Sequence, residues 1–303
     1  MSVTRLLTEP LLAKGLGSIV EPEMTKVRKL KTQHSAAAAA AQTFTFEIPT
    51  DRLIHAILIS IGESTTAGGL DHQGTLADDL TDLVLDSNMG QIKKMLASMT
   101  KQIAIVNKDV QSTGFYKLYF TDPVIKEAMP LPSWLFSSLD LTLTDNAPAA
   151  SNYHHIMVSV IESEIPEGLS VKNWRILFER YLRNKRYGTS TGQQDYDHER
   201  AYKIFGYLYA MDDNGTLSDT IFNKLTVLGI KPNGEHRLYD EAYIAHLKEA
   251  NKQAYQNALA TGYIYAEFPN GYDSGQYRTL LSKLDVPTAG TDAGVRVLER
   301  YLI

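Results

Sequence analysis

The sequence predicts an all-β chain built from two consecutive β-sandwiches, and three observations lead to this prediction. From residue 42 onward, short alternating or continuous apolar runs recur along the chain, which is typical of strands. Only residues 241–258 have the length and the apolar spacing of a long helix. The elements predicted in the first half return in the second half after about 140–150 residues, which indicates a duplicated architecture.

Length and composition agree with this fold class and exclude several chemistries. The 303 residues, 44% of them hydrophobic, suffice for two domains with ample cores. The absence of cysteine excludes disulfides, thiolate metal sites and a cysteine nucleophile. A net charge of -5 argues against a surface that binds nucleic acid throughout, so we expect no specific nucleic-acid partner. No apolar run reaches the ~20 residues of a membrane span, and charges within residues 1–20 argue against a signal peptide.

Residues 1–41 differ from the rest and are predicted to form an N-terminal arm. Six basic and three acidic side chains give the arm a charge of about +3, which leaves about -8 for the remainder. The arm is interpreted either as a flexible leader or as a segment that orders against neighbouring subunits or a lipid surface. The candidate contact residues are Arg5, Lys14, Lys26, Arg28, Lys29 and Lys31.

The first sandwich is assigned to residues 42–165. Residues 43–48 alternate apolar and polar side chains, and residues 53–60 (LIHAILIS) form a near-continuous apolar run, typical of a strand buried on both faces. Further strands are predicted at 102–106, 115–120, 138–144 and 155–161. Residues 62–90 are interpreted as a long loop excursion. Short helices are expected at 76–85, 91–99 and 122–128.

The second sandwich is assigned to residues 166–303, because Pro166 and Gly168 mark the best boundary. Strands are predicted at 174–182, 202–210, 225–230, 235–239, 263–268, 280–286 and 295–303. Pro232-Asn233-Gly234 is a strong hairpin signal, since Asn-Gly tolerates positive φ. Residues 187–199 are expected to form a polar loop. The helix at 241–258 is expected to bury Tyr243, Leu247, Ala250 and Ala254.

Two motifs invite a catalytic or metal-binding interpretation. Gly188-Thr-Ser190-Thr-Gly192 matches G-x-S-x-G, but a nucleophile elbow needs a buried strand before the serine and a helix after it. A flexible loop is therefore the favoured interpretation. His154 and His155 are adjacent in a strand, so their rings should point to opposite faces and cannot chelate one metal as a pair.

Two charged segments of the second half carry alternative interpretations. Residues 195–200 (DYDHER) could supply an acid–base pair, although solvated charge is the default in a polar loop. A basic run interleaved with tyrosines could bind a phosphate backbone, but a charged edge strand or subunit contact is favoured. The run comprises Arg180, Arg183, Lys185 and Arg186. We therefore assign no catalytic residue, cofactor or metal ligand, and expect no enzyme.

The pattern of segments resembles the double jelly-roll major capsid proteins of tailless icosahedral viruses, especially bacterial viruses with an internal membrane. In the first half it is carried by FTFEIPTDRLIHAILIS, FYKLYF and PLPSWLFSSLDLTLT. In the second half it is carried by LTVLGIKPNGEHRLYD, GYIYAEFP and LDVPTAGTDAGVRVLERYLI. The resemblance covers residues 42–303 and is one of element order, without a short diagnostic motif.

The resemblance implies two eight-stranded jelly rolls and a homotrimer with a pseudo-hexagonal outline that tiles a virion shell. It implies an arm directed toward an internal membrane or a neighbouring capsomer, and minor capsid and vertex proteins as further partners. The protein would then reside in the virion, and in the host cytoplasm during assembly. The alternative is a carbohydrate-binding or carbohydrate-active β-sandwich, based on Trp134, Tyr272 and the acidic residues at 195–199.

Overall fold

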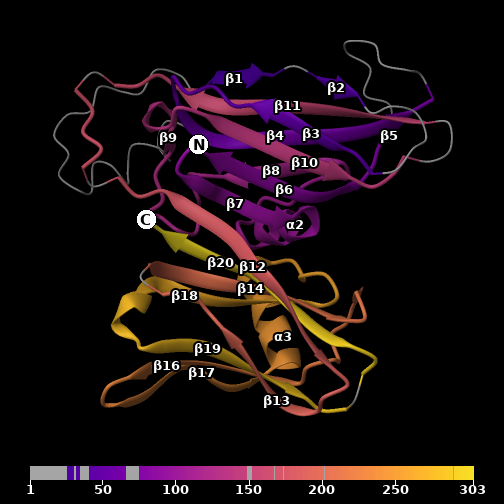
Figure 1. Cartoon of the computed structure of the whole chain (residues 1–303), viewed down its shortest axis with the longest axis vertical. Helices are drawn as coiled ribbons and strands as arrows, with labels where there is room; N and C mark the ends of the chain where they lie inside the picture. Colours follow the sequence, from indigo (N-terminus) through magenta and orange to yellow (C-terminus); the bar gives the residue numbers. More distant parts are fainter. Residues whose placement is uncertain are drawn as a thin grey trace. The chain divides into compact units, whose positions relative to one another are not determined.

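The computed structural model describes residues 26–30, 32–34, 41–65, 75–148, 152–166, 168–172, 174–200, 202–288 and 290–303. The chain forms two compact units, and each unit contains strands of two β-sheets (Figure 1). The first unit holds Gln111–Leu177 and the described residues up to Lys101, and the second holds Gln102–Val110 and Phe178–Ile303.

One sheet of the first unit is built around β4 (Leu53–Ser64), which is buried through most of its length. β4 pairs antiparallel with β11 (Tyr153–Ser163) along one edge and with β8 (Phe115–Tyr119) along the other. Four short strands extend this sheet. β1 (Lys26–Lys29) and β2 (Gln33–His34) pair with β11, while β5 (Thr75–Leu76) and β9 (Leu131–Pro132) pair with β4.

The second sheet of the first unit has the order β7, β6, β10 and β3. Its strands are β3 (Thr43–Glu47), β6 (Leu80–Ser87), β7 (Gly90–Leu96) and β10 (Leu139–Asp145). Alternation buries one face, as Leu139, Leu141 and Leu143 of β10 show. Helix α2 (Ala97–Val106) follows β7, and a single 3₁₀ turn, η1 (Ser133–Leu135), precedes β10.

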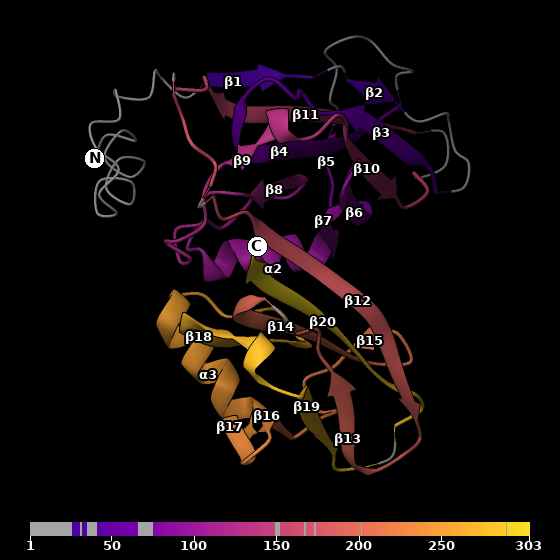
Figure 2. The same cartoon turned by 60° about the vertical axis from the view of Figure 1, so that its left-hand side comes forward.

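The second unit also has two sheets. One contains β12 (Leu177–Gly188), β20 (Ala293–Leu302), β14 (Lys203–Asp213), β15 (Thr216–Leu217) and β18 (Tyr263–Asp273). The other has the order β13 (Gly192–Asp197), β19 (Thr279–Val286), β16 (Lys224–Lys231) and β17 (Gly234–Tyr243). Helix α3 (Ile244–Tyr255) contacts β18, and η2 (Ser274–Gln276) precedes β19 (Figure 2).

The two units repeat the same elements in the same order. β4 pairs with β11 as β14 pairs with β20, and β10 lies between β3 and β6 as β19 lies between β13 and β16. The helices α2 and α3 follow the equivalent strands β7 and β17. The expected all-β fold of two tandem jelly-roll sandwiches is therefore confirmed, with short additional strands around the main ones.

Tyrosine fills much of the second core. Tyr196, Tyr207, Tyr209 and Tyr301 belong to one buried apolar cluster that joins the two sheets. Burial raises the pKa of all four phenols, so they remain neutral hydrogen-bonding groups. The large buried rings supply apolar area, and their hydroxyls place polar atoms inside the sandwich.

Several predicted elements of residues 76–128 are wrong. Residues 102–106 belong to α2, because a short apolar run does not distinguish a strand from a buried helix. The helices predicted at 76–85 and 91–99 are largely replaced by the hairpin of β6 and β7. At 122–128, the Asp122 carboxylate accepts backbone hydrogen bonds from Val124 and Ile125, which forms a local turn in place of a helix.

Two predictions in the second half also need correction. Residues 187–199 are not one loop, since they contain the end of β12 and the whole of β13. The long helix is confirmed but begins at Ile244, because β17 continues to Tyr243. Its buried residues are Ile244, Asn251 and Tyr255, whereas Tyr243 is exposed. Across the described residues, we find no helix with the length and apolarity to cross a membrane.

Candidate functional site

The acidic segment at 195–200 places alternate side chains inside and outside the second sandwich. In β13 and just after it, Tyr196 and His198 are buried, while Asp195 and Asp197 are exposed. This is the ordinary alternation of a strand over a core. The segment therefore combines exposed carboxylates with a histidine that faces the interior.

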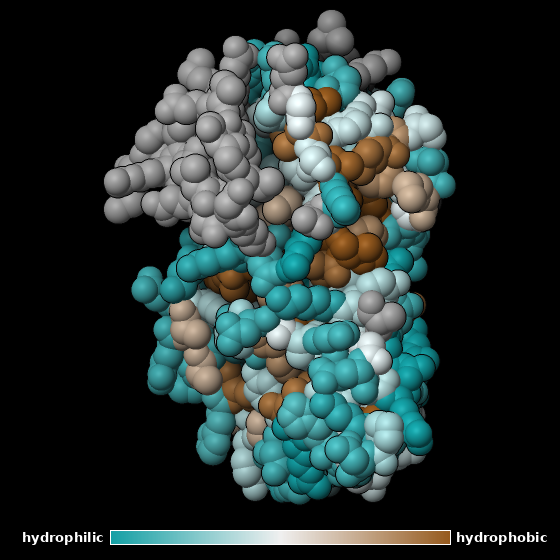
Figure 3. Space-filling model, turned by 90° about the vertical axis from the view of Figure 1, so that its left-hand side faces the viewer, coloured by the Kyte–Doolittle hydropathy of each residue, from teal (hydrophilic) through white to brown (hydrophobic). Residues whose placement is uncertain are grey.

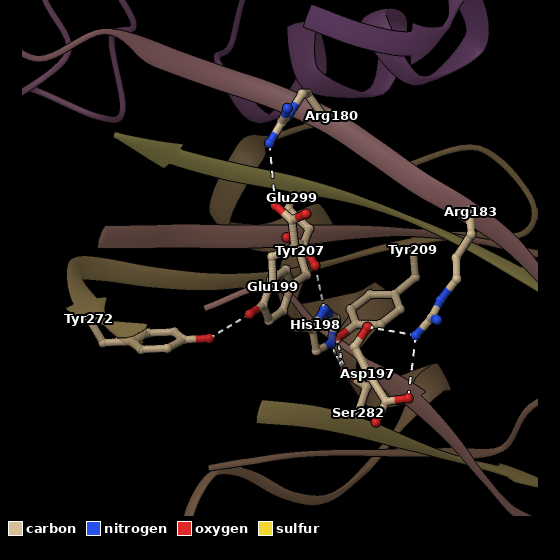
Figure 4. Close-up of polar contacts among 10 residues, drawn as sticks. All are labelled: Arg180, Arg183, Asp197, His198, Glu199, Tyr207, Tyr209, Tyr272, Ser282 and Glu299. Atoms are coloured by element: carbon tan, nitrogen blue, oxygen red, sulfur yellow. Dashed lines mark hydrogen bonds and ion pairs between the residues drawn. The ribbon is translucent and has the colours of Figure 1, made fainter. Parts of the chain in front are cut away.

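His198 lies between β19 and β20, where both ring nitrogens have partners (Figure 4). Nδ1 lies 2.8 Å from Glu299 Oε1, and Nε2 lies 2.7 Å from Ser282 Oγ. The imidazole stacks on the ring of Tyr207 at a centroid distance of 3.9 Å. Ser282, His198 and Glu299 thus share the connectivity of the serine–histidine–acid triad of hydrolases.

Burial argues against catalysis by these three residues. The side chains of His198 and Glu299 are 0% and 1% exposed, and Ser282 is 0% exposed. Ser282 Oγ also lies 2.6 Å from the hydroxyl of Tyr209. A nucleophile must reach a substrate beside groups that stabilise the developing charge. These residues therefore form a satisfied polar network within the core.

The basic run on β12 is neutralised by acidic groups of the same unit. Arg180 Nη2 lies 3.3 Å from Glu199, and Arg183 Nη2 lies 3.4 Å from Asp197 (Figure 4). Lys185 donates to the backbone carbonyl of Asp195. The two charged segments singled out in the sequence therefore meet, which favours a structural role over binding of a phosphate backbone.

Arg186, the last residue of the basic run, has acidic partners of its own. It donates to the buried carboxylate of Asp212 and to the backbone carbonyl of Asp292. The G-x-S-x-G motif follows directly: Gly188 ends β12, Gly192 begins β13, and both have positive φ. A turn between two strands thus stands where a nucleophile elbow requires a helix.

His154 and His155 occupy opposite faces of β11, as the sequence predicts. His154 Nδ1 lies 2.7 Å from Asp145 Oδ2, and His155 Nδ1 lies 2.6 Å from Nδ1 of His34 on β2. Both histidines are fully buried. Each has its own polar partner, so the two do not form a joint chelate.

The structure describes three of the six candidate contact residues of the arm. Lys26, Arg28 and Lys29 lie on β1, which pairs with β11 of the same chain. Arg28 Nε lies 2.9 Å from the carboxylate of Glu162, and Lys26 Nζ lies 3.9 Å from Glu164. Three more candidates, Arg5, Lys14 and Lys31, fall outside the described residues. β1 and β2 thus contribute strands to the first sandwich.

The two aromatic residues behind the carbohydrate hypothesis are both half-buried. A 2.7 Å hydrogen bond joins the hydroxyls of Tyr272 and Tyr207 (Figure 4). Its ring packs edge-to-face on Phe268. Trp134 is half-buried within η1. Stacking on a sugar needs an accessible ring face, so this arrangement does not favour the carbohydrate hypothesis.

Sequence reasoning did not find Ser282, Glu299 or the buried ion pair of Arg300 with Glu179. Their partners are distant in the sequence, and each residue stands within an ordinary apolar strand. A buried charge in a strand is itself a signal, because it must have a partner. Glu299 and Arg300 in the closing strand carry this signal.

Comparisons with known proteins identify the fold. No protein-family model matches the chain, and no curated protein matches it. The major capsid protein P2 of bacteriophage PM2 superposes with a TM-score of 0.66 and 12% identity, over 92% of this chain and 98% of that chain. A chain in the atomic structure of Sulfolobus turreted icosahedral virus gives a TM-score of 0.66 and 13% identity, over 92% and 90% of the two chains. The PBCV-1 virus capsid gives 0.57 and 11% identity, over 94% and 96%.

These similarities show that the chain has the double jelly-roll fold found in major capsid proteins of icosahedral viruses. The shared region covers both sandwiches and nearly the whole of each compared chain. The resemblance inferred from the order of strands is thus confirmed at the level of fold. Two of the compared structures are named as capsid components, the major capsid protein of bacteriophage PM2 and the capsid of PBCV-1.

Proposed function

We propose that this chain is the major capsid protein of an icosahedral virus. The observation that carries the proposal is the similarity of fold over more than 90% of this chain and at least 90% of each compared chain. A match to one sandwich alone would fit many β proteins. Two tandem sandwiches with this order of strands fit a protein that builds a shell.

The proposed assembly unit is a homotrimer whose six jelly rolls give a pseudo-hexagonal outline. Self-association needs apolar groups at the surface. Among the described residues of the first unit, five large apolar side chains are more than a third exposed: Val27, Met89, Phe115, Leu135 and Ile165. Figure 3 shows one face on which apolar side chains gather on the first sandwich, while the second is mainly hydrophilic. Summed over a lattice, many modest contacts hold a shell.

We further propose that the basic arm, residues 1–41, meets an internal membrane or a neighbouring capsomer, with minor capsid and vertex proteins as other partners. The virion would be that of a bacterial virus, assembled in the host cytoplasm. A basic residue near an anionic leaflet gains about 1 kcal/mol. Since Arg28 pairs with Glu162, the basic residues outside β1 are the better candidates for this contact.

The test of the assembly is light scattering combined with electron microscopy of the purified chain. We expect a mass of three chains of 33.8 kDa and particles or sheets of capsomers with a hexagonal outline. A folded chain that stays monomeric at all concentrations, pH values and salt conditions tried would contradict the capsid proposal. Far-ultraviolet circular dichroism separates this outcome from a failure to fold.

The arm needs a separate test, because β1 and β2 belong to the first sandwich. Deletion of residues 1–25 removes Arg5 and Lys14 and leaves β1 and β2 in place. We expect the truncated chain to fold and trimerise but to lose binding to vesicles that contain phosphatidylserine. Unchanged vesicle binding by this variant would overturn the membrane contact, and the capsid proposal would stand.

A further inference from the structure

Four polar side chains meet at one end of the first sandwich, where its two sheets come together. Glu63 lies near the end of β4, and His154 lies opposite it at the start of β11. Asp79 directly precedes β6, and Asp145 ends β10 in the other sheet. The four groups therefore come from four separate strands or strand ends.

Three of these side chains converge on one point. Ligand atoms of Glu63, Asp79 and His154 all lie within 4.8 Å of one another. His154 Nε2 lies 3.3 Å from Asp79 Oδ2. Two ligands that bind Zn²⁺ tetrahedrally, with bonds of about 2.0–2.1 Å, are separated by about 3.3 Å. One imidazole and two carboxylates are a common set of protein ligands for divalent transition metals.

Asp145 orients the histidine for this role. Its Oδ2 accepts a 2.7 Å hydrogen bond from Nδ1 of His154, and both side chains are fully buried. Asp145 is itself fixed, because its Oδ1 accepts a 2.5 Å hydrogen bond from the backbone N–H of Gln42. A proton held on Nδ1 leaves Nε2 directed at the two carboxylates. A carboxylate behind a ligating histidine is the usual outer partner in metal sites.

The second sandwich shows that the fold does not require this cluster. Glu63 on β4 is paired with His154 on β11. At the equivalent positions of the second sandwich, Asp213 on β14 is paired with Ala293 on β20. There the Asp213 carboxylate accepts backbone hydrogen bonds from Thr291 and Asp292, both 2.8 Å long. The second unit thus fills this position with a carboxylate and local amides, and has no histidine there.

We propose that Glu63, Asp79 and His154 bind a divalent transition-metal ion, with Zn²⁺ as the fitting probe and Asp145 as the outer-shell partner of the histidine. Three protein ligands leave the fourth tetrahedral position to a water molecule. The ion would join β4 and β11 of one sheet to the start of β6 in the other. It would therefore stabilise this end of the first sandwich, and the equivalent end of the second would bind no ion.

The alternative without metal is an imidazolium between carboxylates. Burial alone lowers the pKa of His154, but the hydrogen bond and charge of Asp145, aided by Asp79 and Glu63, outweigh it and raise the pKa. A protonated ring would then pair with both Asp145 and Asp79. The two states differ in a measurable way, because a metal ion must displace the Nε2 proton.

The experiment is titration of the EDTA-treated full chain with Zn²⁺, with thermal unfolding measured in parallel. We expect one ion per chain, proton release on binding and a higher unfolding temperature at saturation. Co²⁺ should give the visible absorption of a tetrahedral site and should be displaced by Zn²⁺. No saturable binding, or no change in unfolding temperature on saturation, would overturn the proposal in favour of the imidazolium.

Variants locate the site. Glu63→Gln is the first choice, because Glu63 is half-buried and the variant should fold. Loss of a ligand should weaken binding by more than about 100-fold, and Asp145→Asn should weaken it by about 10–100-fold. Asp213→Asn is the matched control, and its affinity should be unchanged. Full affinity in Glu63→Gln, or equal loss in Asp213→Asn, would contradict the assignment.

Discussion

Asp78 accepts a 2.6 Å hydrogen bond from the backbone N–H of Gly114, and the same contact recurs in the second sandwich. There Asp219 accepts a 2.6 Å bond from the N–H of Gly262. Each aspartate also binds a helix lysine: Lys101 of α2 pairs with Asp78, and Lys248 of α3 pairs with Asp219. The two sandwiches thus use one carboxylate in the same way, to join a loop glycine to the helix.

A serine contact is repeated as well. Ser133 of η1 exchanges hydrogen bonds with the backbone of Arg52, and Ser274 of η2 exchanges the same bonds with Tyr202. Each contact holds the residue that directly precedes a central strand, β4 in the first sandwich and β14 in the second. Only a few side chains make these repeated contacts, so the contacts can be shared without similar sequences throughout the two halves. These contacts support an internal duplication of the sandwich.

Substitution of Gly262 by alanine should test the glycine contact. An added Cβ would lie 2.7 Å from the carbonyl oxygen of Met211 and 2.8 Å from Cβ of Leu217, at a φ of +78°. We expect Gly262→Ala to lower the free energy of unfolding by about 3 kcal/mol or more, because backbone must move. Urea unfolding followed by circular dichroism measures this change.

Gly215 is the matched control for this substitution. Its φ is +85°, but an added Cβ would meet nothing within 4 Å. Gly215→Ala should therefore cost only the backbone strain, about 1–2 kcal/mol. Equal losses in the two variants would show that conformation alone, and not the close approach to Met211, requires the glycine.

The sequence predicted the fold wherever side-chain alternation was regular. β3 and β10 lie close to their predicted places, because alternation reveals one apolar face per strand without knowledge of partners, and β4 does so because its apolar run is nearly continuous. The run QIAIV at 102–106 carries no such information, and in the structure it forms part of α2. Likewise, β13 was missed because its exposed face is polar and only Tyr196 is fully buried within it.

The polar clusters were beyond sequence reasoning for a different reason. His198 is 101 residues from Glu299 and 84 residues from Ser282 in the sequence, so their proximity depends on the completed topology. Glu63 and Asp79 stand in a segment interpreted as a loop excursion, and only the pairing of β4 with β11 places Glu63 beside His154. The charged segments at 180–186 and 195–199 were recognised, but their mutual pairing was not.

Removal of one partner of the buried pair Glu179–Arg300 should lower the free energy of unfolding strongly, whereas replacement of both partners by apolar residues should lower it little. Arg300 Nε lies 2.8 Å from Glu179 Oε1, and both side chains are at most 1% exposed. Glu179→Leu would leave the guanidinium without its carboxylate and should destabilise the chain by about 3–5 kcal/mol. Denaturant titration of Glu179→Leu/Arg300→Met should recover most of that loss. If the double variant is no better than the single one, the pair contributes more than charge compensation.

Ser282 should matter for stability and not for catalysis. Ser282→Ala removes the hydroxyl bonded to His198 and Tyr209, both of which are buried. We expect a loss of about 1–3 kcal/mol in the free energy of unfolding, because partners in the core are left unsatisfied. Neither the wild type nor the variant should hydrolyse ester substrates such as p-nitrophenyl acetate above the buffer rate. Hydrolysis by the wild type that Ser282→Ala abolishes would overturn the structural interpretation.

His55 on β4 should make the first sandwich sensitive to acid. Burial lowers its pKa to about 4 from the usual 6.5, and its ring nitrogens contact the hydroxyls of Ser163 and Thr121. The unfolded chain binds a proton below pH 6.5 that the folded chain does not bind until about pH 4. Stability from this group is therefore complete above pH 6.5 and falls with pH, by about 3 kcal/mol at most.

The measurement is the difference in unfolding free energy between the wild type and His55→Gln across pH 4–7, where glutamine keeps a side-chain hydrogen bond but does not titrate. The raised pKa of His154 changes stability with pH in the opposite sense. Because His154 is present in both chains, its contribution cancels in the difference, which therefore reports on His55. We expect the wild type to lose stability relative to the variant as the pH falls from 6.5 to 4. Parallel pH profiles would show that His55 is already protonated in the folded chain, which its apolar surroundings on β4 oppose.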